Sequence, residues 1–202
     1  GRRSAWASVG VLSDELSAPV LTFGLPVAGT TPLARLIRSA SSDAEPLHLS
    51  LRLLLRHPLS SDAGLAAANI FVCENPTVVA QAINSLGPDC APLVCVNGQF
   101  ATPALILLRQ LRDAGTRLQY HGDFDGGGVA IARRVFAECG AKPWRFSVED
   151  YDRAPKGKAL SGAVGPTPWS PALAERMDRT GRAVHEEAVA HDLAPLLVAV
   201  RR

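Results

Sequence analysis

The chain has 202 residues, a net charge of +2, 47% hydrophobic residues and 20% charged residues. This balance supplies enough apolar side chains for a buried core and excludes an intrinsically disordered chain. No apolar run reaches the ~18 residues of a membrane-spanning helix, and the small net charge neither requires nor excludes a nucleic-acid partner.

Residues 1–65 form an N-terminal flanking segment with weak signals. Its start lacks the build of a signal peptide and the only methionine is Met177, so we expect the C-terminal part of a longer protein. Residues 18–27 (APVLTFGLPV) predict a strand, and residues 31–40 (TPLARLIRSA) predict a helix. Residues 47–59 (LHLSLRLLLRHPL) fit a strand that passes into a helix, although the pattern alone does not decide this.

Strand and helix signals alternate through residues 66–152, which we take as the core. A short apolar run at 69–73 and a strand-like run at 92–96 indicate strands, and residues 117–121 and 142–147 are read as a third and a fourth strand. Helical spacing lies between them, at 77–86, 102–115 and 127–140. This alternation with short turns predicts an α/β fold, with a doubly wound, mainly parallel four-stranded sheet core and flanking helices.

Residues 153–202 are expected to pack on this core as a loop followed by two helices. Residues 154–171 are rich in Pro, Gly and Lys, a composition typical of a loop. Helical patterns follow at 171–180 and 183–200. The HEE tripeptide at 185–187 could add a carboxylate to a site, but acids on a solvated helix face are the favoured interpretation.

The four cysteines form neither a C-x-x-C pair nor a Cys/His cluster. Cys73 and Cys95 lie inside strand-like runs, where a reduced and buried thiol is the usual state. We therefore expect a cytoplasmic protein without a structural zinc site, a disulfide framework or contact with a membrane.

Acidic residues follow two of the predicted core strands. Glu74 follows the first strand, and Asp123 and Asp125 follow the third, directly before the glycines at 126–128. Ligands of an open parallel sheet collect beyond the carboxyl ends of its strands, where the strand order reverses. If the first and third strands are neighbours, the three carboxylates converge, and a hard cation such as Mg²⁺ relieves their repulsion. The alternatives are a turn acid at Glu74 and a helix N-cap at Asp125.

This pattern resembles that of a known fold. A Glu after the first strand and a D-x-D after the third are the signature of the Toprim fold, the metal-binding domain of topoisomerases, primases and small nucleases. More closely, residues 72–132 resemble the C-terminal domain of the bacterial DUF2399 group, and residues 5–27 and 181–189 are also similar to it. That group is related to the nuclease subunit of the Wadjet anti-plasmid system and, more distantly, to the A subunit of topoisomerase VI. Family members often carry an aromatic residue where this chain has Gly126.

The resemblance implies roles for individual residues. It implies a catalytic Mg²⁺ or Mn²⁺ site formed by Glu74, Asp123 and Asp125, with Glu74 as a candidate general acid or base. The residues expected to line its cleft or contact phosphate are Asn75, Gly98, Gln99, His121, Gly126, Gly127 and Gly128. The candidate contacts to the DNA backbone are Arg52, Arg56, Arg133 and Arg134. As a lone histidine at a strand end, His121 fits a structural hydrogen-bonding role better.

The function expected on this basis is a metal-dependent nuclease that hydrolyses DNA phosphodiesters within a plasmid-defence, phage-defence or DNA-processing complex. Topoisomerase-like transesterification needs a nucleophilic tyrosine, and neither Tyr120 nor Tyr151 is well placed for it. A non-catalytic, metal-binding assembly module of such a complex is the alternative. A phosphatase is disfavoured, because the Asp-x-Asp of such enzymes follows the first strand of the fold.

Overall fold

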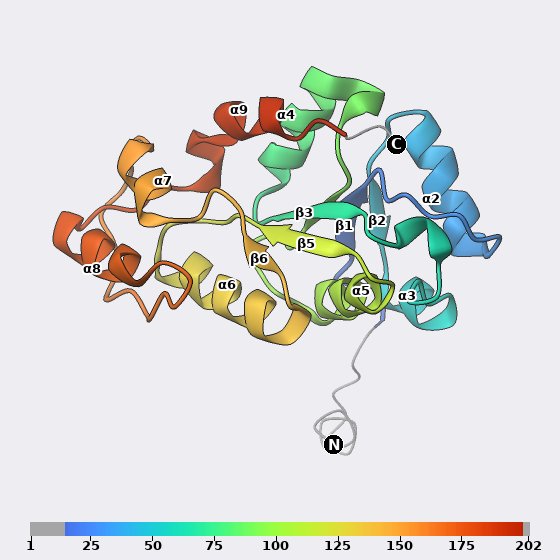
Figure 1. Ribbon diagram of the computed structural model, residues 1–202, viewed down its shortest axis with the longest axis horizontal. Helices are drawn as coiled ribbons and strands as arrows, with labels where there is room; N and C mark the ends of the chain where they lie inside the picture. Colours follow the sequence, from blue (N-terminus) through green and yellow to red (C-terminus); the bar gives the residue numbers. More distant parts are fainter. Residues whose placement is uncertain (1–14, 200–202) are drawn as a thin grey trace, which may run out of the picture.

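A mixed and mostly parallel sheet forms the centre of the computed structural model, which describes residues 15–199 (Figure 1). Its strands are β1 (Val20–Phe23), β2 (Leu47–Leu49), β3 (Asn69–Cys73), β4 (Leu93–Cys95), β5 (Arg117–Tyr120) and β6 (Lys142–Pro143). They lie in the order β2-β1-β4-β3-β5-β6. Strands β4, β3, β5 and β6 are parallel to their neighbours in this series, whereas β1 is antiparallel to both β2 and β4.

The helices cover both faces of this sheet. They are α2 (Pro32–Ser42), α3 (Leu51–Arg56), α4 (Pro76–Leu86), α5 (Thr102–Asp113), α6 (Gly126–Cys139), α7 (Val148–Arg153), α8 (Pro171–Thr180) and α9 (Ala190–Leu193). Helices α4 and α9 lie on one face, and α5 and α6 lie on the other (Figure 1). Four helices begin with a proline in the first turn, where the missing amide hydrogen costs no helical hydrogen bond. None of the helices within residues 15–199 is long and apolar enough to cross a bilayer.

The fold confirms the predicted α/β class but corrects its strand count. Four strands were expected, and six are present because β1 and β2 from the flanking segment join the same sheet. Residues 142–147 were expected to form a strand, yet β6 has two residues and Ser147 already caps α7. The Ser147 hydroxyl accepts from the Asp150 amide, and the Asp150 carboxylate accepts from the Ser147 amide, so a capping box ends the extended segment early.

The C-terminal segment also differs from the expectation. Residues 183–200 were expected to form one helix, but their described part forms the short turns η3 (Glu186–Ala188), α9 and η4 (Ala194–Leu196). Val184 forms an isolated antiparallel bridge with Phe124, which keeps the backbone before η3 extended. Pro195, within η4, cannot continue a helical hydrogen-bond ladder.

The order of the strands reverses between β3 and β5. The chain passes from β3 to β4 on one side and then crosses to β5 on the other side of β3. Strands β3 and β5 pair in parallel, with Val72 opposite Tyr120, so their carboxyl ends lie side by side. The predicted convergence of acids required that the first and third core strands be neighbours. The structure meets this condition, because these strands are β3 and β5.

Candidate functional site

The turn after β5 is built around a buried phenylalanine. Phe124 lies between the two aspartates and is 1% exposed. Its ring packs on Phe146 with centroids 4.7 Å apart, and its amide donates to the Val184 carbonyl at 2.8 Å. Phe124, the middle residue of the Asp-x-Asp, is buried in the core. It therefore fixes the backbone of the turn that carries Asp123 and Asp125.

Helix α6 begins directly against this turn. Asp125 is its N-cap, and the Asp125 Oδ1 accepts from the Gly128 amide at 2.7 Å. A Cβ atom at Gly128 would lie only 2.1 Å from the carbonyl oxygen of Asp123, so only glycine fits there without a shift of backbone. Gly128 thus allows the helix to approach the backbone of Asp123. Gly122 is similarly confined, because its Cβ would lie 2.5 Å from the Tyr120 hydroxyl.

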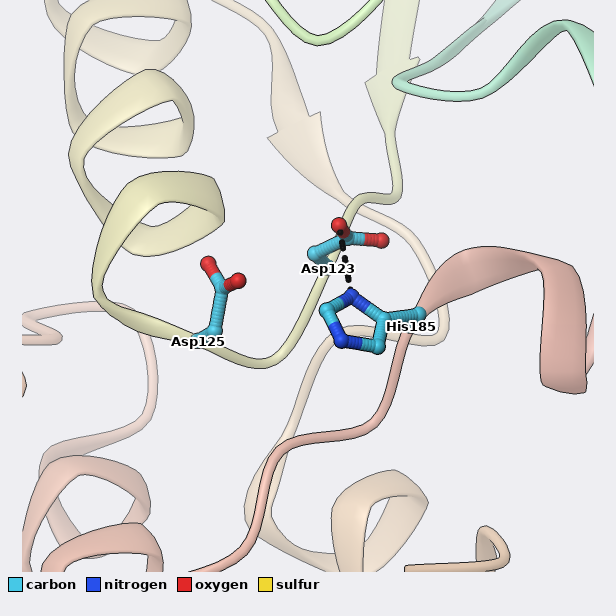
Figure 2. Close-up of side chains that lie close together, drawn as sticks. All are labelled: Asp123, Asp125 and His185. Atoms are coloured by element: carbon cyan, nitrogen blue, oxygen red, sulfur yellow. Dashed lines mark hydrogen bonds and ion pairs between the residues drawn. The ribbon is translucent and has the colours of Figure 1, made fainter. Parts of the chain in front are cut away.

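Two aspartates and a histidine come together in front of the sheet edge. One ligand atom from each of Asp123, Asp125 and His185 lies within 4.8 Å of the other two, and all three residues are partly exposed. The His185 Nδ1 and the Asp123 Oδ2 are 3.2 Å apart. Figure 2 shows that the aspartates come from the turn between β5 and α6, whereas His185 comes from the C-terminal segment. We call these three residues the outer set.

Glu74 lies behind the outer set and outside it. It is 7% exposed, and its Oε2 accepts from the Asp123 amide at 3.1 Å and from the Tyr120 hydroxyl at 3.4 Å. Burial, reinforced by the nearby negative charge of Asp123, raises the pKa of the Glu74 carboxyl to about 8. Burial also raises the pKa of Tyr120 well above its ordinary value. The structure therefore brings Asp123 and Asp125 together in one group, with Glu74 supporting the Asp123 backbone.

Glu186 is the centre of the buried layer. It is fully buried, its Oε2 accepts from the amides of Glu74 at 2.9 Å and Asn75 at 2.5 Å, and its Oε1 lies 2.9 Å from the His121 Nδ1. The Glu186 amide itself donates to the Asp123 Oδ1 at 2.7 Å. Burial raises the pKa of the Glu186 carboxyl, and the His121 partner opposes this rise. We call Glu74, His121 and Glu186 the inner set.

These contacts correct one expectation from the sequence. The acids of residues 185–187 were expected on a solvated helix face, but Glu186 is 0% exposed and ties the ends of β3 and β5 together. Only Glu187 of the pair is exposed to solvent. The structural role favoured for His121 agrees with its burial and with its contact to Glu186.

The other predicted cleft residues surround this edge. Asn75 caps α4 by accepting from the Thr77 amide at 2.8 Å. The Gly98 amide donates to the Glu74 carbonyl at 3.0 Å, so the turn after β4 adjoins the end of β3. Gly98 and Gln99 are exposed in that turn. Their contact with a phosphate stays a prediction.

The predicted DNA-binding arginines lie on two separate helices. Arg133 and Arg134 are on α6, the helix that Asp125 caps. Arg52 and Arg56 are on α3, which packs against α5 and lies at the opposite side of the view from α7 and α8 (Figure 1). Arg52 is 3.8 Å from Glu15 in an ion pair. The α6 pair therefore belongs to the side of the molecule that carries the candidate site.

Neither tyrosine is available as a nucleophile in this arrangement. Tyr120 and Tyr151 are both fully buried, and the Tyr151 hydroxyl donates to the Arg182 carbonyl at 2.7 Å. This agrees with the expectation that neither residue is placed for transesterification.

The fold and the position of the acidic residues assign the chain to a structural class. The chain is an α/β protein whose acidic residues gather at the reversal of strand order, the usual ligand-binding position of such sheets. The model of the family described as "Protein of unknown function C-terminus (DUF2399)" matches residues 47–197, and the chain belongs to this family. Among curated proteins, no relative is found.

Proposed function

We propose that this chain is a Toprim-type nuclease domain that hydrolyses DNA phosphodiesters with the help of a divalent cation. The observation that carries the proposal is the convergence of Asp123, Asp125 and His185 at the edge between β3 and β5. The acids at the ends of the first and third core strands, in that order, are those of the Toprim signature.

The residues of the outer set fit a divalent cation. Two ligand atoms that bind one Mg²⁺ at 2.0–2.1 Å are at most about 4.2 Å apart. The three ligand atoms lie within 4.8 Å of one another, so small side-chain movements suffice to bring them to that separation. Carboxylate oxygens suit Mg²⁺ and Mn²⁺, and the imidazole of His185 favours Mn²⁺ over Mg²⁺. Asp123, Asp125 and His185 would hold the ion, and Glu74 remains a candidate ligand if its side chain turns.

In the proposed reaction, the ion and the chain have different roles. A divalent cation bound there would neutralise charge on the scissile phosphate and lower the pKa of a bound water. The chain's own residues supply position: Glu74 and Glu186 hold the backbone and carboxylate of Asp123. The first amides of α6, beside Asp125, favour a phosphate through the positive end of the helix dipole.

The similarity to the Wadjet nuclease subunit supports a wider proposal. We place the chain in a multi-subunit complex with protein partners that acts in plasmid or phage defence or in DNA processing. Its polynucleotide partner is DNA, because nucleases and topoisomerases with this signature act on it.

A nicking assay tests the proposed chemistry. Supercoiled plasmid is incubated with the full-length protein and EDTA, Mg²⁺ or Mn²⁺, alone and together with its companion proteins. We expect nicking that needs the metal, is lost in Asp123→Asn and Asp125→Asn, and persists in Glu187→Gln, a charge change at an exposed neighbour. Cleavage that is unaffected by either aspartate variant would contradict the proposal.

One observation favours a second candidate, a metal-binding assembly module without catalysis. The Glu74 Oε2 accepts from the Asp123 amide and the Tyr120 hydroxyl, and Glu74 is not a member of the outer set, so the candidate general base is already engaged in structural contacts. This candidate predicts that Mn²⁺ raises the melting temperature of the protein, whereas plasmid stays intact in every reaction of the nicking assay.

A further inference from the structure

A shallow groove follows the second half of α6. It has a volume of about 780 Å³ and lies between α6 and the loop that precedes α8. Its walls include Arg133, Arg134, Phe136, Glu138, Pro168 and Trp169. The groove therefore combines two cations with aromatic rings, whereas the turn before α6 carries the two aspartates of the outer set.

The indole of Trp169 is fixed in the groove wall. Its Nε1 donates to the Phe146 carbonyl at 2.9 Å. Its ring lies edge-on to Phe136, with centroids 4.8 Å apart, and nearly parallel to Phe146 at 5.7 Å. The side chain is nevertheless only half-buried. A rigid and partly exposed indole loses little conformational entropy when a flat ring stacks on it.

The groove is positively charged although the whole chain is close to neutral. Arg134 and Arg109 both pair with Glu138, at 3.2 and 3.1 Å. Among residues 15–199, Arg133 forms no ion pair that would neutralise it, and its Nη1 reaches within 3.2 Å of the Cβ position of Gly165. Arg134 and Arg109 thus share the Glu138 carboxylate, and Arg133 adds a further positive charge to the groove wall. This excess charge suits phosphates, which guanidinium groups bind with two parallel hydrogen bonds.

The groove lies along α6, the helix that Asp125 of the outer set caps. Arg133 is eight residues beyond Asp125, which is about 12 Å along a helix at 1.5 Å per residue. The loop runs beside α6 over this distance: the Ala163 carbonyl is 3.7 Å from the Cβ position of Gly126, and Trp169 contacts Phe136 further along. A strand lying in the groove would reach the outer set within a few nucleotides.

We infer that this groove binds single-stranded DNA, with a base stacked on Trp169 and phosphates held by Arg133 and Arg134. A single strand fits better than a duplex, because the faces of paired bases are covered by their neighbours and cannot stack on a side chain. The inference rests on the proposed function in one respect, namely that the bound strand is the one presented to Asp123, Asp125 and His185.

Binding is measured by fluorescence anisotropy of a labelled oligothymidine in EDTA, so that no cleavage occurs. We expect Arg133→Ala and Trp169→Ala each to weaken binding about tenfold, in the range that loss of one stacking contact or phosphate contact produces. Arg179→Ala is the matched control, because Arg179 is exposed on α8 and forms its own ion pair with Glu175. A labelled duplex of the same length should bind more weakly than the single strand.

A second readout does not depend on the stability of the alanine variant. Oligothymidine should quench the tryptophan fluorescence of the wild-type protein but quench Trp169→Phe much less, because Phe keeps an aromatic ring in the wall and removes the reporting indole. Equal affinity for single strand and duplex, equal effects of Arg133→Ala and Arg179→Ala, or equal quenching of both proteins would overturn the inference. Binding without plasmid nicking would refute the proposed nuclease alone, whereas nicking without binding in the groove would refute this inference alone.

Discussion

The outer set and the inner set have the same chemical composition but different surroundings. Each contains two carboxylates and one imidazole: Asp123, Asp125 and His185 in the outer set, and Glu74, His121 and Glu186 in the inner set. The outer residues are partly exposed, whereas the inner residues are 7%, 2% and 0% exposed.

The two sets differ in burial and in the hydrogen bonds that their carboxylates already make. The Glu186 carboxylate accepts from two backbone amides and contacts His121, so an added ligand would have to displace existing partners. In the outer set, the Asp125 Oδ1 accepts from the Gly128 amide, and Asp125 offers a ligand atom within 4.8 Å of those of Asp123 and His185. Type of residue alone would not separate the two sets.

The largest expected effect is on the inner set. Glu186→Ala should lower the free energy of unfolding by about 3–5 kcal/mol, because it leaves His121 and two amides buried without their partner. Urea denaturation measures this change. Glu187→Ala, at the exposed neighbour, should stay within about 0.5 kcal/mol of wild type. Similar losses in both variants would mean that Glu186 does not organise the site.

A metal titration tests the outer set. Wild-type protein should gain about 2.7 kcal/mol of stability when free Mn²⁺ reaches one hundred times its dissociation constant. Asp125→Asn should gain much less, because it removes one anionic ligand. Without metal its melting temperature should hold or rise, since repulsion with Asp123 falls and Asn still caps α6. Thermal melts across the titration provide the measurement, and equal responses of the two proteins would refute the metal site.

The contact between the turn and α6 gives a third test. Gly128→Ala should lower the free energy of unfolding by about 1–3 kcal/mol, because its Cβ would lie 2.1 Å from the Asp123 carbonyl oxygen. Gly126→Ala is the matched control in the same turn of helix, where the Cβ would lie 3.7 Å from the nearest atom. It should be neutral or stabilising by up to about 1 kcal/mol. Equal costs measured by urea denaturation would contradict the close approach.

The smallest expected effect concerns the pH dependence of stability. The pKa of Glu74 is raised from 4.5 to about 8, so between these values the folded protein retains a proton that the unfolded chain releases. Stability of the wild type should therefore fall as pH rises through this window. In Glu74→Gln the fall between pH 6 and pH 7 should be smaller by about 1 kcal/mol. Denaturation curves in EDTA at both pH values measure it, and identical slopes would place Glu74 in a more hydrated environment than its contacts indicate.

Much of the fold could be predicted because its signals are local. The run at residues 69–73 is mostly apolar, residues 117–120 alternate polar side chains with buried Leu118 and Tyr120, and the helices between them have 3.6-residue spacing. The membership of β1 and β2 in the sheet was less visible, because pairing between distant segments leaves no local mark. The early end of β6, in contrast, has a local signal in the sequence. Ser147 followed three residues later by Asp150 is a capping-box pattern.

The candidate site could be predicted only in part, for the same reason. Asp123 and Asp125 follow a strand directly, and the rule about strand ends places them at the edge. His185 and Glu186 reach the site through the bridge between Phe124 and Val184, and the His185 contact to Asp123 spans 62 residues of sequence. A contact between residues so far apart in the sequence cannot be predicted from the spacing of motifs. Gly122, confined by Tyr120, was likewise indistinguishable from an ordinary turn glycine.

The bridge between Phe124 and Val184 also bears on the time at which the site forms. The bond from the Glu74 amide to Glu186 closes a loop of 112 residues, among the most distant contacts in the molecule. Contacts of such separation are entropically costly and tend to form late in folding. Until the C-terminal segment docks on the sheet edge, the Asp123 carboxylate lacks both His185 and the Glu186 amide. Capture of a ligand at this edge is therefore expected to be one of the last events in the maturation of the protein.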